Sequence, residues 1–226
     1  HQVHGALSIV GLDGVTQFAE ALESLLEAVA QRPADAATTA LAQRALASIG
    51  HYLDDLVSGQ PNQPLRLLSI YREVQAARGV ERAAASDLFF PDLGVPPPAR
   101  PADARSLTLG ELQALLRRER PRFQRGFLAW LRSPENGAGI AEMRDALRCI
   151  EETQESASAR AFWWVAGGLL GALGEGALPA DADVKQLFAR IDLQIRRLFE
   201  GSRNVAERLL RDALYLVSRA DPASAA

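Results

Sequence analysis

Hydrophobic residues recur every three or four positions along most of the chain, and the alternating pattern typical of strands is absent. Before residue 87, this spacing predicts helices over residues 1–10, 15–32, 36–57 and 64–85. Residues that favour turns separate these segments, among them Gly11, Gly14, Pro33 and Gly59. Residues 1–86 are therefore predicted to form a first helical bundle.

The same spacing returns after residue 105 and predicts helices over residues 112–131, 140–150, 162–173, 184–199 and 205–216. The segment 162–173 is almost wholly apolar, so we expect it at the centre of a second bundle. The core of this bundle should hold its large hydrophobic residues, Phe127, Trp130, Phe162, Trp163, Phe188 and Phe199. The predicted fold class is all-α, with two consecutive helical bundles.

A proline-rich segment between the bundles cannot be helical, because prolines remove backbone donors and hold the chain extended. Phe89, Phe90 and Leu93 need burial, so residues 89–93 should pack on a bundle, while the proline run 96–98 should be exposed. The predicted organisation is a bundle over 1–86, a connector over 87–105 and a bundle over 106–226.

Composition narrows the classes of function. The 226 residues carry a net charge of −3, which gives no reason to expect a nucleic-acid partner. Cys149 is the single cysteine, which excludes an internal disulfide framework and suits a reducing cytoplasm. The most apolar segment, 161–173, is shorter than the roughly 20 apolar residues that span a bilayer. We therefore expect a cytoplasmic protein without membrane insertion.

The first residues of the chain, His1, His4 and Gly5, have the layout of a histidine phosphotransfer site. A phosphoryl acceptor must stand on an exposed helix face, and the residue three positions on lies beside it. Gly5 has no side chain, so a partner protein can approach the backbone closely. His4 is mostly neutral at pH 7, which weakens charge stabilisation of a phosphoryl group.

Two other interpretations of this segment stay open. In the first, His1 and His4 are polar residues on a solvated helix face. In the second, they are two ligands of a zinc ion, and the only other histidine and cysteine of the chain are His51 and Cys149. In each surface interpretation His1 faces solvent. The opposite side of the helix then turns its apolar residues inward: Val3, Leu7 and Val10.

Further along the chain, three features permit a functional and a structural interpretation. Trp163 and Trp164 point about 100° apart on a helix, so one should be core and the other should meet a neighbour. The arginines of residues 117–125 can face an acidic partner or solvent, and the glutamates of 151–155 form an acidic patch. Gly167-Gly168 permits a close helix approach or a kink. Ser-His-Asp, paired-carboxylate and nucleotide-binding patterns are absent.

Taken in order, several segments resemble one protein family. HQVHGALSIV and VTQFAEALESLL are similar to the N-terminal histidine-phosphotransfer-like region of CheA-type hybrid histidine kinases of the type IV pilus chemosensory system. A similar region occurs in the pilus-regulatory scaffold FimL. The likeness continues through REVQAARGVERAAASDLFFPDL, RFQRGFLAWLR, ARIDLQIRRLFEG and NVAERLLRDALYLVSRA.

The resemblance implies a phosphotransfer bundle that lacks its first helix, with His1 as the phosphoryl acceptor or donor for a CheY-like receiver domain. His4 stands where the family has an assisting lysine. The chain itself would need no cofactor, since the receiver brings Mg²⁺, and it would be the non-catalytic part of a kinase polypeptide. The alternative is a degenerate scaffold that is not phosphorylated and that docks receiver or polar-localisation proteins.

Overall fold

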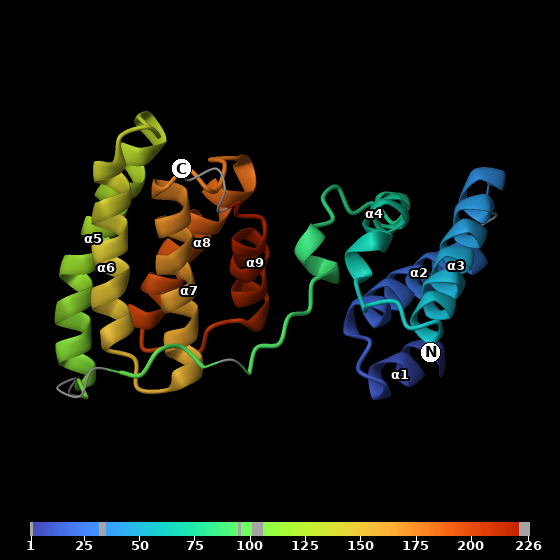
Figure 1. Ribbon diagram of the computed structural model, residues 1–226, viewed down its shortest axis with the longest axis horizontal. Helices are drawn as coiled ribbons and strands as arrows, with labels where there is room; N and C mark the ends of the chain where they lie inside the picture. Colours follow the sequence, from blue (N-terminus) through green and yellow to red (C-terminus); the bar gives the residue numbers. More distant parts are fainter. Residues whose placement is uncertain (1, 32–34, 95, 101–105, 222–226) are drawn as a thin grey trace. The chain divides into compact units, whose positions relative to one another are not determined.

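The computed structural model describes residues 2–31, 35–94, 96–100 and 106–221. Within these ranges the chain forms nine α-helices and two short 3-10 helices and contains no strand, which confirms the predicted all-α class (Figure 1). The chain divides into two compact units, His1–Phe90 and Pro91–Ala226. No helix in the described ranges has the length and apolar character needed to cross a membrane.

The first unit is organised around one long helix. Its elements are α1 (Gln2–Ile9), α2 (Asp13–Gln31), α3 (Ala36–Val57), η1 (Pro64–Leu67), α4 (Leu68–Ala77) and η2 (Ala85–Leu88). Helix α2 packs against α1, α3, α4 and η2, so its apolar face is the core of the unit. Phe18 of α2 is fully buried, and its ring makes an edge-to-face contact of 5.8 Å with the ring of Tyr71 in α4.

The prediction of one helix over residues 64–85 is wrong, because the α-helix in this part of the first unit is shorter. A 3-10 turn precedes α4, which ends at Ala77, and the chain then turns at Gly79 with a φ of 80°. That left-handed conformation costs glycine little and costs other residues more, so it ends the helix. The amide of Val80 donates to the carbonyl of Gln75 at 2.9 Å and closes the turn.

A chain of hydrogen-bonded polar side chains connects α4 to the segment that follows it, and two of them, Tyr71 and Gln75, are buried. Gln75 Nε2 donates to Tyr71 Oη at 2.6 Å, and Arg78 donates to Gln75 Oε1 at 2.7 Å. Tyr71 in turn donates to Asp87 of η2 at 3.4 Å, and Asp87 accepts from the amide of Ala84 at 3.0 Å. These bonds satisfy polar groups that would otherwise cost free energy in the core.

Some apolar residues at helical spacing in the first unit are exposed. Val10 is 73% exposed, because α1 ends at Ile9 and the chain turns at Gly11. Leu46 is 64% exposed, because α3 buries Ala42, Ala45 and Ile49 and Leu46 stands about 100° around the helix from Ala45.

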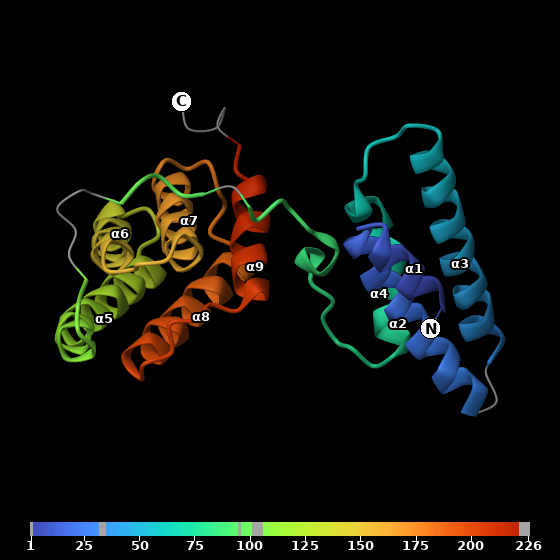
Figure 2. The same cartoon turned by 90° about the horizontal axis from the view of Figure 1, so that it is seen from below.

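The second unit contains five helices arranged in a closed ring. They are α5 (Leu109–Arg132), α6 (Gly137–Glu152), α7 (Ala157–Gly174), α8 (Ala182–Phe199) and α9 (Glu207–Ser218). Helix α5 packs on α6 and α8, α6 on α7, α7 on α9, and α9 on α8. Figure 2 shows the resulting two layers, with α6, α7 and α9 in one layer and α5 and α8 in the other.

Aromatic residues form part of the core of this unit. The rings of Trp130 and Phe188 meet edge to face at 5.7 Å, and Phe127 lies 6.2 Å from Phe188. Trp163 is buried, whereas Trp164 is 43% exposed, so the adjacent tryptophans do point to different environments. Most of the large residues predicted for this core are buried, and Phe127 and Phe199 are half-buried against it.

Close helix contact in this unit occurs at a glycine pair other than the predicted one. A Cβ on Gly126 of α5 would lie 2.7 Å from the carbonyl of Gly139 in α6, and a Cβ on Gly139 would lie 2.6 Å from the carbonyl of Gly126. Gly167 and Gly168 of α7 have no described atom within 4 Å of such a Cβ. The close approach therefore belongs to α5 and α6, where only a hydrogen fits.

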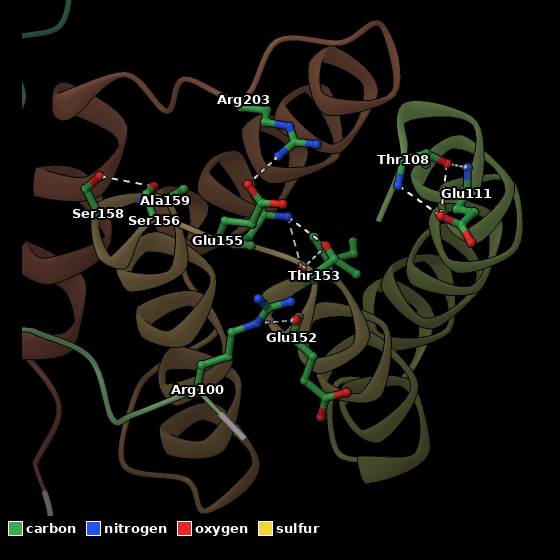
Figure 3. A network of polar contacts seen from close by, with 12 residues as sticks. Arg100, Thr108, Glu111, Glu152, Thr153, Glu155, Ser156, Ser158, Ala159 and Arg203 are labelled. Carbon is green, nitrogen blue, oxygen red and sulfur yellow. Dashed lines mark hydrogen bonds and ion pairs between the residues drawn. The ribbon is translucent and has the colours of Figure 1, made fainter. Parts of the chain in front are cut away.

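Part of the proline-rich segment is held against the second unit. Pro97 is buried, so the expectation of an exposed proline run is wrong at that residue. Arg160 of α7 donates to the carbonyl of Pro98 at 2.5 Å, and Arg100 donates to the carbonyl of Glu152 at 3.3 Å (Figure 3). The burial of Pro97 and these two bonds fix the path of residues 97–100.

Candidate functional site

The candidate phosphotransfer residues lie at the start of the first unit. His1 is outside the described residues, and His4 belongs to α1, although its side chain is outside the described part of the structure. Gly5 is half-buried, and a Cβ placed on it would meet no described atom within 4 Å. Packing of the unit thus does not require glycine at this position, which leaves its role toward a partner as a prediction.

The inward face of α1 is described only in part. Leu7 is buried as predicted, Val10 is exposed, and the side chain of Val3 lies outside the described part. Across from α1, Phe18, Leu22 and Leu25 of α2 are buried as the spacing indicates.

The zinc interpretation gains no support from the described residues. They contain no group of three or more histidine, cysteine, aspartate or glutamate residues that could hold a metal ion. His51 instead lines an open cavity of about 440 Å³ between α3 and α4, and Cys149 belongs to α6 of the second unit.

The cavity beside His51 is lined by cations that already have partners. Arg44 forms an ion pair with Glu73 at 2.7 Å, and Arg66 forms one with Asp55 at 2.8 Å. All four side chains are well exposed, and exposed pairs of this kind contribute about 0–1 kcal/mol. The cavity therefore has mixed charge and no strong preference for an anion.

The arginines of α5 divide between two neighbouring helices. Arg122 pairs with Asp145 at 2.8 Å and Arg125 with Glu142 at 3.7 Å, both on α6. Arg120 donates two hydrogen bonds to Asp192 of α8, at 3.0 and 2.9 Å. The sequence predicted that these arginines face an acidic partner or solvent. Instead, these pairs connect α5 to α6 on one side and to α8 on the other.

Glu119 is the charged residue that the sequence places least well. The sequence surrounds it with arginines, but its side chain is 2% exposed at the boundary of α5 and α6. Arg118 Nε donates to its Oε1 at 2.6 Å, and Arg122 lies 3.7 Å from its Oε2. Its helical spacing from Leu116 and Phe123 was the available indication, because those residues mark the buried stripe of α5.

Cys149 of α6 lies near this buried carboxylate. Burial raises the pKa of its thiol above the ordinary value of 9.0, and the negative charges of Glu119 and Glu152 raise that pKa further. A thiol with a raised pKa is protonated near pH 7 and is a poor nucleophile. The arrangement therefore indicates a structural cysteine.

Residues of the acidic patch predicted at 151–155 contact neighbouring segments at the end of the second unit (Figure 3). Glu155 forms an ion pair with Arg203 at 3.4 Å, and the backbone carbonyl of Glu152 accepts from Arg100. Burial raises the pKa of Glu151, with Glu152 adding to the rise and Arg160 opposing it. These contacts connect the loop between α6 and α7 to neighbouring segments.

The second unit also matches a known family. Residues 108–226 match the family described as FimL scaffold protein second domain. The chain belongs to this family. It is also 26% identical over 223 residues to the protein named "Scaffold protein FimL" of Pseudomonas aeruginosa, a match that covers 97% of this chain. The chain spans 40% of the length of that relative. No solved structure matches the chain.

The FimL second domain begins where the helical ring begins. The match starts at Thr108, whose amide donates to Glu111 Oε2 at 2.9 Å while its hydroxyl accepts from the Glu111 amide at 3.3 Å (Figure 3). This reciprocal pair caps α5 and sets its first turn. The arginines of α5 and the exposed Trp164 thus belong to the FimL second domain, whereas His1, His4 and Gly5 lie outside that match.

Proposed function

We propose that this chain is a protein-docking part of a scaffold in the chemosensory system that controls type IV pili. The observation that carries the proposal is its similarity, over 97% of its length, to a protein named as a scaffold. The assignment to the pilus system rests on the segments that resemble pilus chemosensory proteins in the same order along the chain. The partners we propose are a CheY-like receiver domain and polar-localisation proteins.

The described surface supports docking more than it supports catalysis. Its two units are closed around separate apolar cores, and the charged side chains of α5 connect helices to each other. Exposed apolar residues, such as Trp164, stand on a well-packed helix in the second unit. Tryptophans in such positions often supply much of the binding energy at protein interfaces.

Phosphotransfer through His1 is the second candidate, and the spacing of His1, His4 and Gly5 favours it. In that reaction the phosphoryl group passes from the aspartyl phosphate of a receiver to a ring nitrogen of His1, and the receiver's carboxylate is released. The receiver supplies Mg²⁺, and His4 contributes less charge than the lysine of the family.

A strain in which this protein carries His1→Gln separates the two candidates. The scaffold proposal predicts twitching motility equal to that of the wild type, because docking does not need a phosphoryl acceptor. A control strain lacking this protein sets the value for loss of function. Motility reduced to that control value, together with an acid-labile phosphohistidine found only in the wild-type protein, would favour phosphotransfer.

A further inference from the structure

Positive charge in this chain is concentrated on two neighbouring helices. Helix α5 carries six arginines and two glutamates, and α8 carries three arginines, one lysine and two aspartates. The chain as a whole has a net charge of −3. Helices α5 and α8 pack on each other. Arg122 and Arg125 of α5 pair with α6 and Arg190 of α8 pairs with Asp212 of α9, so the other cations of the two helices are the ones available on the surface between them.

Contacts between the two helices show that they run antiparallel. Gln113 near the start of α5 donates to the carbonyl of Phe199 at the end of α8, at 3.1 Å. In the middle, Gln124 donates to Asp192 at 3.0 Å. Towards the end of α5, the ring of Phe127 contacts the ring of Phe188, which lies one turn before Asp192 on α8.

Exposed apolar side chains border the seam between the helices. Leu128 stands one turn beyond Gln124 and is 53% exposed, while Leu193 follows Asp192 and is 51% exposed. Ala189, one turn before Leu193, is exposed as well. We call this surface the α5–α8 face, and it is made by Arg117, Leu128, Lys185, Ala189, Leu193 and Arg196.

The cations of this face are more available than its carboxylates. Arg117 and Lys185 have no ion-pair partner among the residues that the structure describes, and the Arg117 guanidinium lies 5.6 Å from the Phe199 ring. Arg196 pairs with Glu200 at 2.9 Å, but both side chains are more than half exposed. Asp192 is occupied by hydrogen bonds from Arg120 and Gln124.

We propose that the α5–α8 face docks an acidic amphipathic helix of another protein. The apolar stripe of that helix would cover Leu128, Ala189 and Leu193, and its aspartates and glutamates would meet Arg117 and Lys185. Burial of the leucines supplies affinity, while the complementary charges set orientation and speed encounter. The inference rests on the proposed docking function and names one surface and one class of partner for it.

A peptide probe tests the chemistry without a known partner. The probe is a helical peptide of about 18 residues, five turns, with leucines on one face and glutamates elsewhere. Fluorescence anisotropy should show saturable binding that weakens as salt rises. The same peptide with lysine in place of each glutamate should bind at least about tenfold more weakly, because it meets like charge.

Surface variants locate the binding. Leu128→Glu, Leu193→Glu and Arg117→Glu should each weaken binding about tenfold or more, since each adds negative charge or removes apolar contact. Leu46→Glu is the matched control, because Leu46 is a leucine on α3 of the other unit that is also more than half exposed. Circular dichroism checks that each variant keeps its helical content.

Several outcomes would overturn the inference. One is the absence of binding, or equal binding of the acidic and basic peptides. Another is wild-type affinity in all three face variants. Sedimentation tests a second copy as occupant, since α2 carries four acidic and no basic residues. A dimer that Leu193→Glu dissociates would show that another copy covers the face. None of these results depends on the motility of the His1→Gln strain, so this inference and the proposed function can fail separately.

Discussion

Cys149 and Glu119 show that single residues in this chain take their properties from the boundary between α5 and α6. From the sequence, Glu119 belongs to a run of arginines and Cys149 is the one candidate thiol ligand. In the fold, Glu119 is buried beside Arg118, and its charge acts on the Cys149 thiol. Helical spacing indicates the burial of Glu119, but it does not reveal the effect of this charge on Cys149, because that effect arises between two helices.

We predict that Cys149 reacts slowly with Ellman's reagent near neutral pH. Its pKa is raised first by burial and then by Glu119 and Glu152, so little thiolate is present until the pH exceeds 9.0. The rate should be well below that of a free small-molecule thiol measured beside it, and it should increase in alkaline buffer. A rate equal to that of the free thiol at neutral pH would contradict the described environment of Cys149.

Among the elements, the periodic apolar stripes were the most predictable feature. They gave the positions of most helices and the burial of Phe18, Trp163 and Phe188. Short-range spacing could not show that Gly79 would end α4 early, because the helix end depends on a turn and on the Tyr71 network. It also could not show which glycines meet across a helix interface.

The glycine contact between α5 and α6 gives a direct test at this scale. Gly126→Ala should destabilise the second unit by about 1–3 kcal/mol, because its methyl group would collide with the Gly139 carbonyl. Gly168→Ala in α7 is the matched control and should instead stabilise by about 0.5–1 kcal/mol, since its methyl meets open space in a helix interior. Urea unfolding measures both. Equal effects of the two substitutions would show that the close approach is absent.

The cap of α8 adds a pH-dependent prediction. Burial acts to raise the pKa of Asp181, but hydrogen bonds from the Val184 amide and Arg219 hold it below its ordinary value of 3.8. The resulting stabilisation is present above pH 3.8 and is lost as the pH falls through the folded-state pKa. Asp181→Ala should cost about 1 kcal/mol at neutral pH.

Asp181→Asn separates the cap from the charge. Asparagine also caps helices well, so this variant should lose less stability than Asp181→Ala at neutral pH. The difference between wild type and Asp181→Asn should shrink as the pH is lowered, because the wild-type carboxylate becomes protonated. A difference that stays constant between neutral and acidic pH, in urea unfolding, would show that the charge of Asp181 does not contribute.

For the whole molecule, the sequence predicted the all-α class and a resemblance to pilus chemosensory proteins. The family match to the FimL second domain supports the scaffold branch of that resemblance over residues 108–226. The site at His1, His4 and Gly5 stays a prediction, since His1 and the side chain of His4 lie outside the described part of the structure. Local residue patterns can place a histidine on a helix, but whether it is phosphorylated depends on a partner protein.

Binding of a purified CheY-like receiver domain from the same pilus system tests the central claim of a docking scaffold most directly. Isothermal titration calorimetry should give a measurable Kd for the wild-type chain, and the Kd of His1→Gln should agree within about twofold, which is about 0.4 kcal/mol. The receiver is measured both free and with beryllofluoride and Mg²⁺, which mimic its phosphorylated state. Absence of binding to every receiver of the system, or binding that His1→Gln abolishes, would contradict the account.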